Sequence, residues 1–185
     1  QFLIKPGSRS VFRKINIYDN YSNKFQQRIK HKSFQQIKNE NSFFNNINDK
    51  LTEYQNLKLG KLSIIHGDPV FSNIFIDISG KIKFVDPRGE IHNIDTIYGD
   101  MFYDYAKIYQ SLTGFEQISK HLDVNHNFYN EKKIFFENYF KSKFPNFDFY
   151  FLKILTASLY ISLIPFQDQA LAKKFLKLSK EIVKK

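Results

Sequence analysis

The stretch Ile64–Asn73 reads IIHGDPVFSN, and two short motifs follow it, VDPRG at residues 85–89 and GDMFYDYA at residues 99–106. Asp68 and Asn73 have the spacing of the kinase catalytic loop, where the aspartate accepts the proton of a hydroxyl and the asparagine binds a metal. Asp86 supplies a second carboxylate. Oxygen ligands of this kind suit Mg²⁺, which neutralises phosphate charge. The three side chains therefore predict a phosphoryl-transfer site.

A β-hairpin is predicted between the catalytic loop and the second aspartate. Residues Asn73–Asp77 and Lys81–Val85 are rich in β-branched and aromatic side chains, and Ser79-Gly80 between them is typical of a turn. The second strand alternates lysines with apolar residues, which predicts that one face of the hairpin is solvated. Such a hairpin would return the chain so that Asn73 and Asp86 converge.

Together these motifs resemble the aminoglycoside phosphotransferase and choline kinase family, the small-molecule branch of the protein-kinase-like fold. The resemblance rests on His66-Gly67-Asp68 with Asn73, on Asp86 after a hairpin, and on Gly99-Asp100 followed by Asp104-Tyr105-Ala106 at the start of a helix. It implies an α+β, mainly α-helical fold. In this fold a short β-hairpin of the carboxy-terminal lobe carries the catalytic and metal-binding loops.

The resemblance also implies a role for each motif residue. Asp68 would be the catalytic base, and Asn73 and Asp86 would bind Mg²⁺. Three further residues would support the catalytic loop structurally, and they are His66, Asp104 and, as a helix cap, Asp100. ATP would be the phosphoryl donor, and the acceptor would be a hydroxyl of a small molecule such as an amino alcohol, a sugar or an aminoglycoside-like compound.

The sequence departs from the family after the second aspartate. Many relatives have a bulky aromatic or acidic residue there, whereas this chain has Pro87-Arg88-Gly89-Glu90. The departure leaves the acceptor open, and Arg88 and Glu90 are candidate substrate contacts. Arg88 could instead pair with Glu90 or with Asp95. The run resembles phosphotransferase domains associated with bacterial surface-polysaccharide synthesis.

The features of an amino-terminal kinase lobe are missing from the chain. Its seven glycines form no G-x-G-x-x-G loop, and the 65 residues before His66 predict helices where a nucleotide-covering sheet would be needed. We therefore expect residues 1–185 to form a single domain, the catalytic lobe alone. A lobe or domain upstream of Gln1 is the expected partner, and the chain is expected to be a piece of a longer protein.

Composition limits the remaining classes of function. The net charge is +10, but the lysines occur singly or in pairs along the whole chain, which is typical of a solvated surface and not of a nucleic-acid site. The absence of cysteine excludes disulfides and favours a cytoplasmic location. The most apolar segment, Ile154–Phe166, is about 13 residues long, which predicts a core helix and no membrane span, since a span needs roughly 20 residues.

Helices are predicted on both sides of the motifs. Apolar residues at spacings near three and four between Asn20 and Leu57 predict two helices that pack beneath the catalytic loop, with a break near Asn39–Asn45. The other predicted elements are a helix over Met101–Leu112 that ends at Thr113-Gly114, a polar connection from His121 to Asn127, a helix over Asn130–Lys143 that ends at Pro145, and two helices separated at Pro165.

Two functions from other classes remain open at this point. The lobe could be catalytically incomplete and serve as a binding or interaction module, because the glycine-rich loop is missing. Alternatively, Asp68, Asp86 and Asp100 could form the metal site of a phosphoesterase, which would hydrolyse phosphate esters without an acceptor alcohol.

Overall fold

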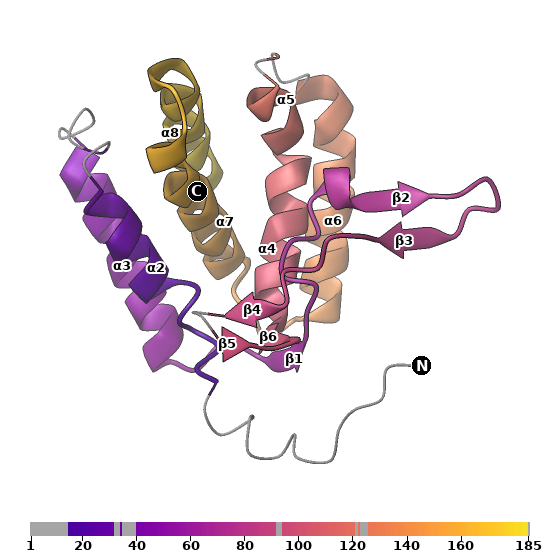
Figure 1. Ribbon diagram of the computed structural model, residues 1–185, viewed down its shortest axis with the longest axis horizontal. Helices are drawn as coiled ribbons and strands as arrows, with labels where there is room; N and C mark the ends of the chain where they lie inside the picture. The colour runs from indigo at the N-terminus through magenta and orange to yellow at the C-terminus, as the bar shows by residue number, and fades with distance from the viewer. Residues whose placement is uncertain are drawn as a thin grey trace.

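The computed structural model describes residues 15–31, 34, 40–91, 94–120, 122 and 126–184, and in these residues the fold is α+β and mainly α-helical, as predicted (Figure 1). The helices are α2 (Ser22–Ile29), α3 (Asn41–Asn56), α4 (Met101–Leu112), α5 (Phe115–Ser119), α6 (His126–Lys143), α7 (Phe149–Leu163) and α8 (Gln169–Val183). Two short 3₁₀ turns are η2 (Phe71–Asn73) and η3 (Ile164–Phe166).

The strands form small antiparallel pairs. They are β1 (Leu62–Ile64), β2 (Ile74–Ile76), β3 (Ile82–Phe84), β4 (Glu90–Ile91), β5 (Ile94–Asp95) and β6 (Tyr98–Asp100). β1 pairs with β6, β2 with β3, and β4 with β5. The β1–β6 pair places Leu62 opposite Asp100, so the chain that leads to the His66–Asp68 loop lies beside the chain that leads to α4.

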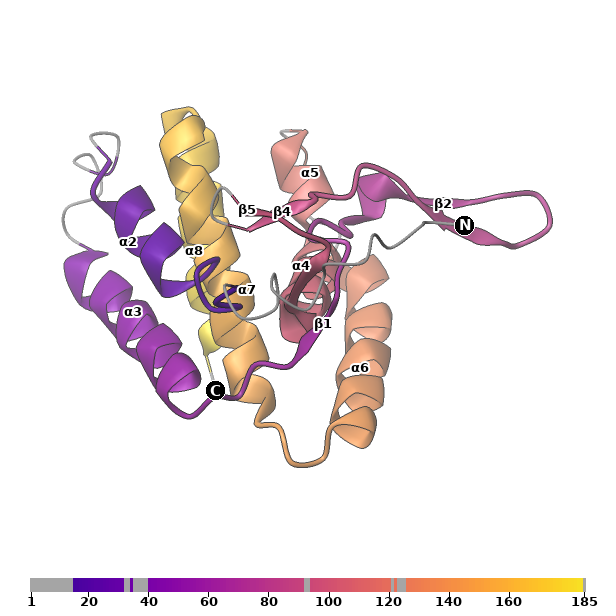
Figure 2. The same ribbon diagram turned by 60° about the horizontal axis from the view of Figure 1, so that its bottom comes forward.

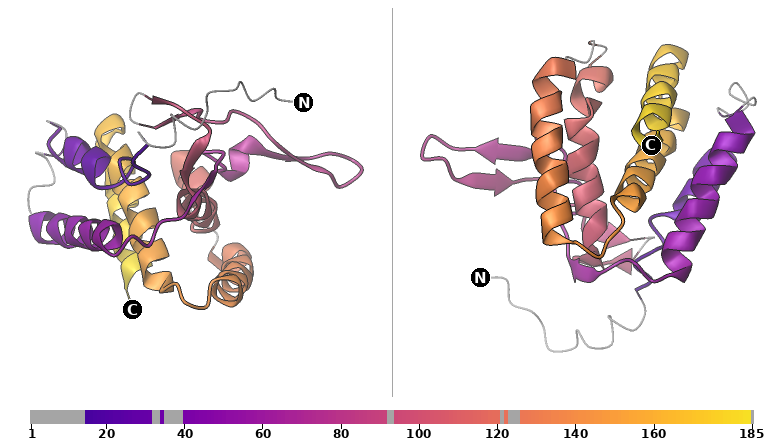
Figure 3. Two further views of the ribbon diagram at one scale, coloured as in Figure 1. Left: turned by 90° about the horizontal axis from the view of Figure 1, so that it is seen from below. Right: turned by 180° about the vertical axis from the view of Figure 1, so that it is seen from behind.

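Helix α7 forms the centre of the core. All of its residues except Tyr150, Lys153 and Leu163 are buried, as expected of a helix that is apolar on every side. It contacts α2, α3, α4 and α8. The views agree that α7 and α8 lie between the α2–α3 pair and the α4–α6 pair (Figures 2 and 3).

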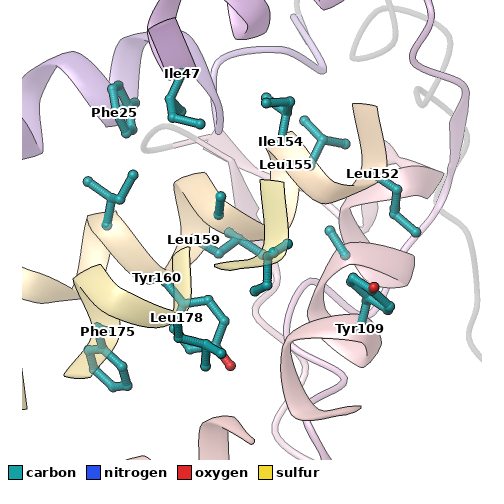
Figure 4. Close-up of a cluster of buried hydrophobic side chains, with 14 of the residues drawn as sticks. Phe25, Ile47, Tyr109, Leu152, Ile154, Leu155, Leu159, Tyr160, Phe175 and Leu178 are labelled. Carbon is teal, nitrogen blue, oxygen red and sulfur yellow. The ribbon is translucent and has the colours of Figure 1, made fainter. Parts of the chain in front are cut away.

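Side chains from all these layers meet around α7 (Figure 4). Ile47, Leu155 and Tyr160 have no exposed surface, and Phe25 and Phe175 are almost completely buried. Burial of one such side chain stabilises a fold by roughly 1.5–3 kcal/mol relative to exposure. The core is therefore the main source of stability for the helices that hold the loops.

The predicted helices after the motifs are present. α4 spans Met101–Leu112 and ends where Gly114 takes a φ of +104°, and η3 with Pro165 separates α7 from α8. α6 begins at His126, four residues earlier than predicted, and the sequence analysis missed α5. Most of the predicted polar connection, residues 121 and 123–125, lies outside the described residues.

The position of the break between the first two helices was predicted wrongly. α3 begins at Asn41, so Asn41–Asn45 is helical, and α2 ends at Ile29. The apolar positions Phe43, Phe44 and Ile47 continue the pattern into α3. Much of the connection, residues 32–33 and 35–39, lies outside the described residues.

One helical segment is long and apolar enough to cross a membrane by length and composition alone. It spans Phe149–Phe166, so the length argument made from the sequence does not hold, because the helix begins before Ile154. The segment is 78% buried inside the protein. Its apolar side chains thus belong to the core of the protein, as predicted.

The hairpin between Asn73 and Asp86 has the predicted strands and turn. At its tip Asp77 accepts hydrogen bonds from the backbone amides of Ser79 and Lys81, and Gly80 has a φ of +79°. The face that carries Lys81 and Lys83 is solvated, as predicted, but the opposite face is not buried. Apolar side chains on both faces are exposed, because the hairpin projects away from the helices (Figure 1): Phe75, Ile76, Ile82 and Phe84.

Candidate active site

The loop His66–Asp68 is held against the first turn of α4. The backbone amides of His66 and Gly67 donate to the two carboxylate oxygens of Asp104, at 2.7 and 2.9 Å. Burial raises the pKa of Asp104 above its ordinary value, although the two amides act to lower it. A single carboxylate on a rigid helix therefore fixes the start of the loop.

Gly67 allows a second loop to pack against the first. Its φ is +82°, and a Cβ at this position would lie 2.7 Å from Cβ of Arg88, so a side chain there would be both strained and obstructed. The amide of Arg88 donates to the carbonyl of His66 at 2.9 Å. This contact brings the segment that contains Asp86 beside the loop that contains Asp68.

Asp68 is oriented by two neighbours. Its amide donates to Nδ1 of His66 at 3.3 Å, and Lys107 Nζ lies 2.9 Å from its Oδ1. The side chain of Lys107 is only 11% exposed, whereas that of Asp68 is 38% exposed. The carboxylate is thus fixed from the protein side and remains accessible from solvent.

Asn73 links the His66–Asp68 loop to the hairpin. Its Nδ2 donates to the carbonyl of Asp68 at 2.9 Å, and its own carbonyl accepts from the amide of Val85 at 3.0 Å. Asn73 therefore lies opposite the residue that precedes Asp86, which is the convergence expected of the hairpin. Asp86 is exposed and has a φ of +58°, a conformation that is uncommon outside glycine and is found at functional sites.

Asp100 lies in a different environment. It is 1% exposed and caps α4 by accepting from the amide of Phe102. The hydroxyls of Tyr21 and Tyr54 and the amide of Lys61 also donate to its carboxylate. Burial raises the pKa of Asp100, and these hydrogen bonds oppose the shift. Its oxygens are occupied by the protein, so Asp100 is a structural residue of the loop support.

The two candidate substrate contacts differ in position. Arg88 donates from Nη1 to the hydroxyl of Tyr103 at 3.1 Å and lines a cavity with Asp68. Glu90 is an exposed residue of β4 that is not among the residues lining this cavity. The structure therefore brings Arg88, and not Glu90, to the open side of Asp68.

The cavity beside Asp68 has a volume of about 380 Å³. α2, the end of α7, η3 and the loop after β3 surround it, and its lining residues are Lys24, Arg28, Asp68, Asp86, Pro87, Arg88, Lys107, Leu159, Ser162, Leu163 and Phe166. A smaller cavity of about 160 Å³ near Tyr109 and Glu137 contains none of the predicted site residues.

The sequence analysis missed three cations of the larger cavity. Lys107 had a signal, because it follows Asp104 by three residues and so lies on the same face of α4 as the loop anchor. Lys24 and Arg28 are separated by one helical turn of α2, which also places them on one face. Nothing local connects that face to Asp68, since the contact arises only when α2 packs on α7.

Comparisons of the chain with protein-family models, with curated proteins and with solved structures gave no match.

Proposed function

We propose that this chain is the catalytic lobe of a phosphotransferase of the aminoglycoside phosphotransferase and choline kinase type, which transfers the γ-phosphoryl group of Mg-ATP to a hydroxyl of a small molecule. The observation that carries the proposal is the convergence of Asp68, Asn73 and Asp86. Hydrogen bonds between Asn73 and Asp68, and between Val85 and Asn73, hold these residues at one end of the hairpin.

Asp68 is the proposed proton acceptor. It is a partly exposed carboxylate at the wall of a cavity that is large enough for a small molecule. In the proposed step the acceptor oxygen forms a bond to the γ-phosphorus, and the bond from that phosphorus to the bridging oxygen breaks. ADP leaves with the electron pair of that bond, and the hydroxyl proton passes to Asp68. Lys107 holds the Asp68 carboxylate in place during this step.

The residues present fit a magnesium ion. The side-chain nitrogen of Asn73 donates to the carbonyl of Asp68, so the side-chain oxygen of Asn73 is the atom available to a cation. Asp86 offers an exposed carboxylate. Both are oxygen ligands of the kind that Mg²⁺ prefers. When bound, the ion would neutralise the phosphates of the nucleotide.

An additional lobe is part of the proposal. β1 and the hairpin expose apolar side chains next to the proposed metal ligands, among them Ile64, Phe75 and Ile76. Several large exposed apolar side chains on a projecting hairpin are typical of a contact surface. We propose that a nucleotide-clamping lobe covers it in the complete enzyme.

The phosphoesterase alternative has less support. It needs Asp100 together with Asp68 and Asp86, but the oxygens of Asp100 accept hydrogen bonds from Tyr21, Tyr54 and Lys61. Among the described residues, no group of three or more His, Cys, Asp or Glu side chains is placed to hold a metal. The proposed ligand pair of an asparagine and an aspartate does not require such a group.

The identity of the product tests the proposed function. The complete enzyme, which is this chain with any nucleotide-clamping lobe encoded beside it, is incubated with Mg-ATP and a panel of hydroxyl compounds, and ³¹P NMR follows the phosphorus. We expect ADP and a phosphate ester to form in equal amounts. Release of inorganic phosphate with no dependence on the acceptor would favour a hydrolase. Absence of both turnover and nucleotide binding would favour a binding module.

A further inference from the structure

The cavity beside Asp68 has an excess of positive charge. Four cations line it, and they come from three parts of the chain: Lys24 and Arg28 on α2, Arg88 after β3, and Lys107 on α4. The lining contains only two carboxylates, Asp68 and Asp86. Asp68 is paired with Lys107, and Asp86 is the proposed metal ligand. No carboxylate in the cavity is therefore left for the other three cations.

These three cations have neutral neighbours. Arg28 lies over the ring of Phe166, with 4.4 Å from its guanidinium carbon to the ring centre, and Arg88 donates to the hydroxyl of Tyr103. In the part of the chain that the structure describes, no carboxylate forms an ion pair with Lys24, Arg28 or Arg88. Lys24 and Arg28 are partly buried, and a partly buried cation without a counter-charge has lost hydration that a bound anion could replace.

The pKa of Tyr103 indicates that the electrostatic potential beside the cavity is positive. The residue is 1% exposed, and burial acts to raise the pKa of its hydroxyl. The neighbouring charges of Lys24, Lys107 and Arg88 outweigh this effect, and the pKa of Tyr103 is lowered. Burial also lowers the pKa of Lys24. Both shifts are those expected where positive charges are concentrated with little solvent.

We infer that the acceptor carries an anionic group of its own, a phosphate or a carboxylate, which Lys24, Arg28 and Arg88 bind while its hydroxyl faces Asp68. The inference rests on the proposed function, and it selects among the acceptors that the resemblance allows. Amino alcohols and aminoglycosides are cations that this cavity would repel, whereas a sugar or polyol ester of phosphate would be attracted. Arginine favours such groups because its guanidinium can bind phosphate or carboxylate with two parallel hydrogen bonds.

Lys24 and Arg28 belong to a helix far from the hairpin, which supports a role in binding the acceptor, whereas Asp86 lines the same cavity as the proposed metal ligand. The hairpin that leads to Asn73 and Asp86 projects on one side of the molecule, and α2 lies on the opposite side (Figures 1 and 3). Leu159, Ser162 and Leu163 near the end of α7 also line the cavity. A volume of about 380 Å³ is at the lower end of the roughly 300–1,000 Å³ of small-molecule sites.

Binding of a matched series tests the inference without turnover, because this chain alone lines the cavity. Glucose, glucose 6-phosphate and glucosamine serve as neutral, anionic and cationic probes and are titrated into the 185-residue chain by calorimetry. We expect glucose 6-phosphate to bind at least about tenfold more tightly than glucose, equivalent to about 1.4 kcal/mol. Equal binding of the three, preference for glucosamine, or binding of none would overturn the inference.

Substitutions identify the residues that cause the preference for the anionic probe. The Lys24→Gln/Arg28→Gln double variant should reduce the affinity for glucose 6-phosphate to that for glucose, and Arg88→Gln, on an exposed loop, should reduce it about threefold or more. Lys173→Gln, an exposed change on α8, should have no effect. A double variant that retains the full preference would overturn the inference. Displacement of glucose 6-phosphate by an equal concentration of ADP would also overturn it, because the cations would then serve the nucleotide.

Measurement of phosphoryl transfer to the three classes of acceptor tests this inference separately from the proposed function. Transfer from Mg-ATP to anionic acceptors with a kcat/KM at least tenfold above that for neutral and cationic analogues would support both. Transfer at equal kcat/KM to all three classes would overturn the inference and leave the function. Absence of any transfer, with the preference for the anionic probe retained, would overturn the function and with it the role of the site as an acceptor site.

Discussion

Helix α7 and the β2–β3 hairpin are both rich in large apolar residues, yet those of the helix are mostly buried and those of the hairpin are mostly exposed. Leu155 of α7 has no exposed surface, whereas Ile76 of β2 is 70% exposed. The helix contacts α2, α3, α4 and α8, while the hairpin contacts η2, its own strands and the ring of His66, which lies beside Phe84. The comparison indicates that apolar residues have two different roles in this protein. In α7 it stabilises the lobe, and in the hairpin it leaves a surface for another part of the enzyme.

The largest expected effect on stability comes from a substitution in the buried helix α7. Leu155→Ala should lower the free energy of unfolding by about 2–5 kcal/mol, because it removes buried methyl groups and leaves a cavity in the core. Urea denaturation of the wild type and the variant measures the change, with an unchanged m-value as the check that the same transition is observed.

A substitution in the exposed hairpin is the matched control for this experiment. Ile76→Ala removes a similar side chain from a solvated strand and should change the free energy of unfolding by no more than about 0.5 kcal/mol. Losses of similar size in Ile76→Ala and Leu155→Ala would show that the hairpin is packed in solution, and the proposed contact surface would then be excluded.

A smaller effect should separate the two proposed metal ligands at the base of the hairpin. Asp86→Asn should weaken Mg²⁺-dependent nucleotide binding in the complete enzyme by about tenfold, and more than Asn73→Ala does, since a carboxylate binds a hard cation more strongly than an amide. Asparagine tolerates the left-handed backbone of Asp86, so the change tests the charge alone.

Calorimetry with ATP in the presence and absence of Mg²⁺ measures this difference. Asp49→Asn, the same chemical change on an exposed residue of α3, is the control and should bind as the wild type does. Undiminished binding by Asp86→Asn and Asn73→Ala alike would remove both residues from the proposed metal site.

The parts of the molecule that the sequence predicts well are those specified by neighbouring residues. The hairpin, its turn at Asp77–Lys81 and helix α4 with its stop at Gly114 follow from local propensity and turn chemistry. The convergence of Asn73 with Asp86 also follows, because a two-stranded hairpin has a fixed register. These are the elements that carry the candidate catalytic residues.

The sequence could not predict features that depend on tertiary packing. The cations of α2 line the cavity of Asp68 only because α2 lies against α7, a contact between segments far apart in the chain. The exposure of both hairpin faces depends equally on the lack of a covering neighbour among the described residues, since even Phe84, which lies beside the ring of His66, is 53% exposed. Alternation of lysine with isoleucine predicts a half-buried strand when such a neighbour is assumed.

Replacement of Asp68 tests the proposed chemistry most directly. In the complete enzyme Asp68→Asn should lower kcat by on the order of 10² or more and leave nucleotide affinity nearly unchanged, because the carboxylate acts on the acceptor hydroxyl in the transition state. Asparagine retains the size of the side chain, and Asp49→Asn again serves as the control. Turnover by Asp68→Asn close to that of the wild type would contradict the assignment of Asp68 as the catalytic base.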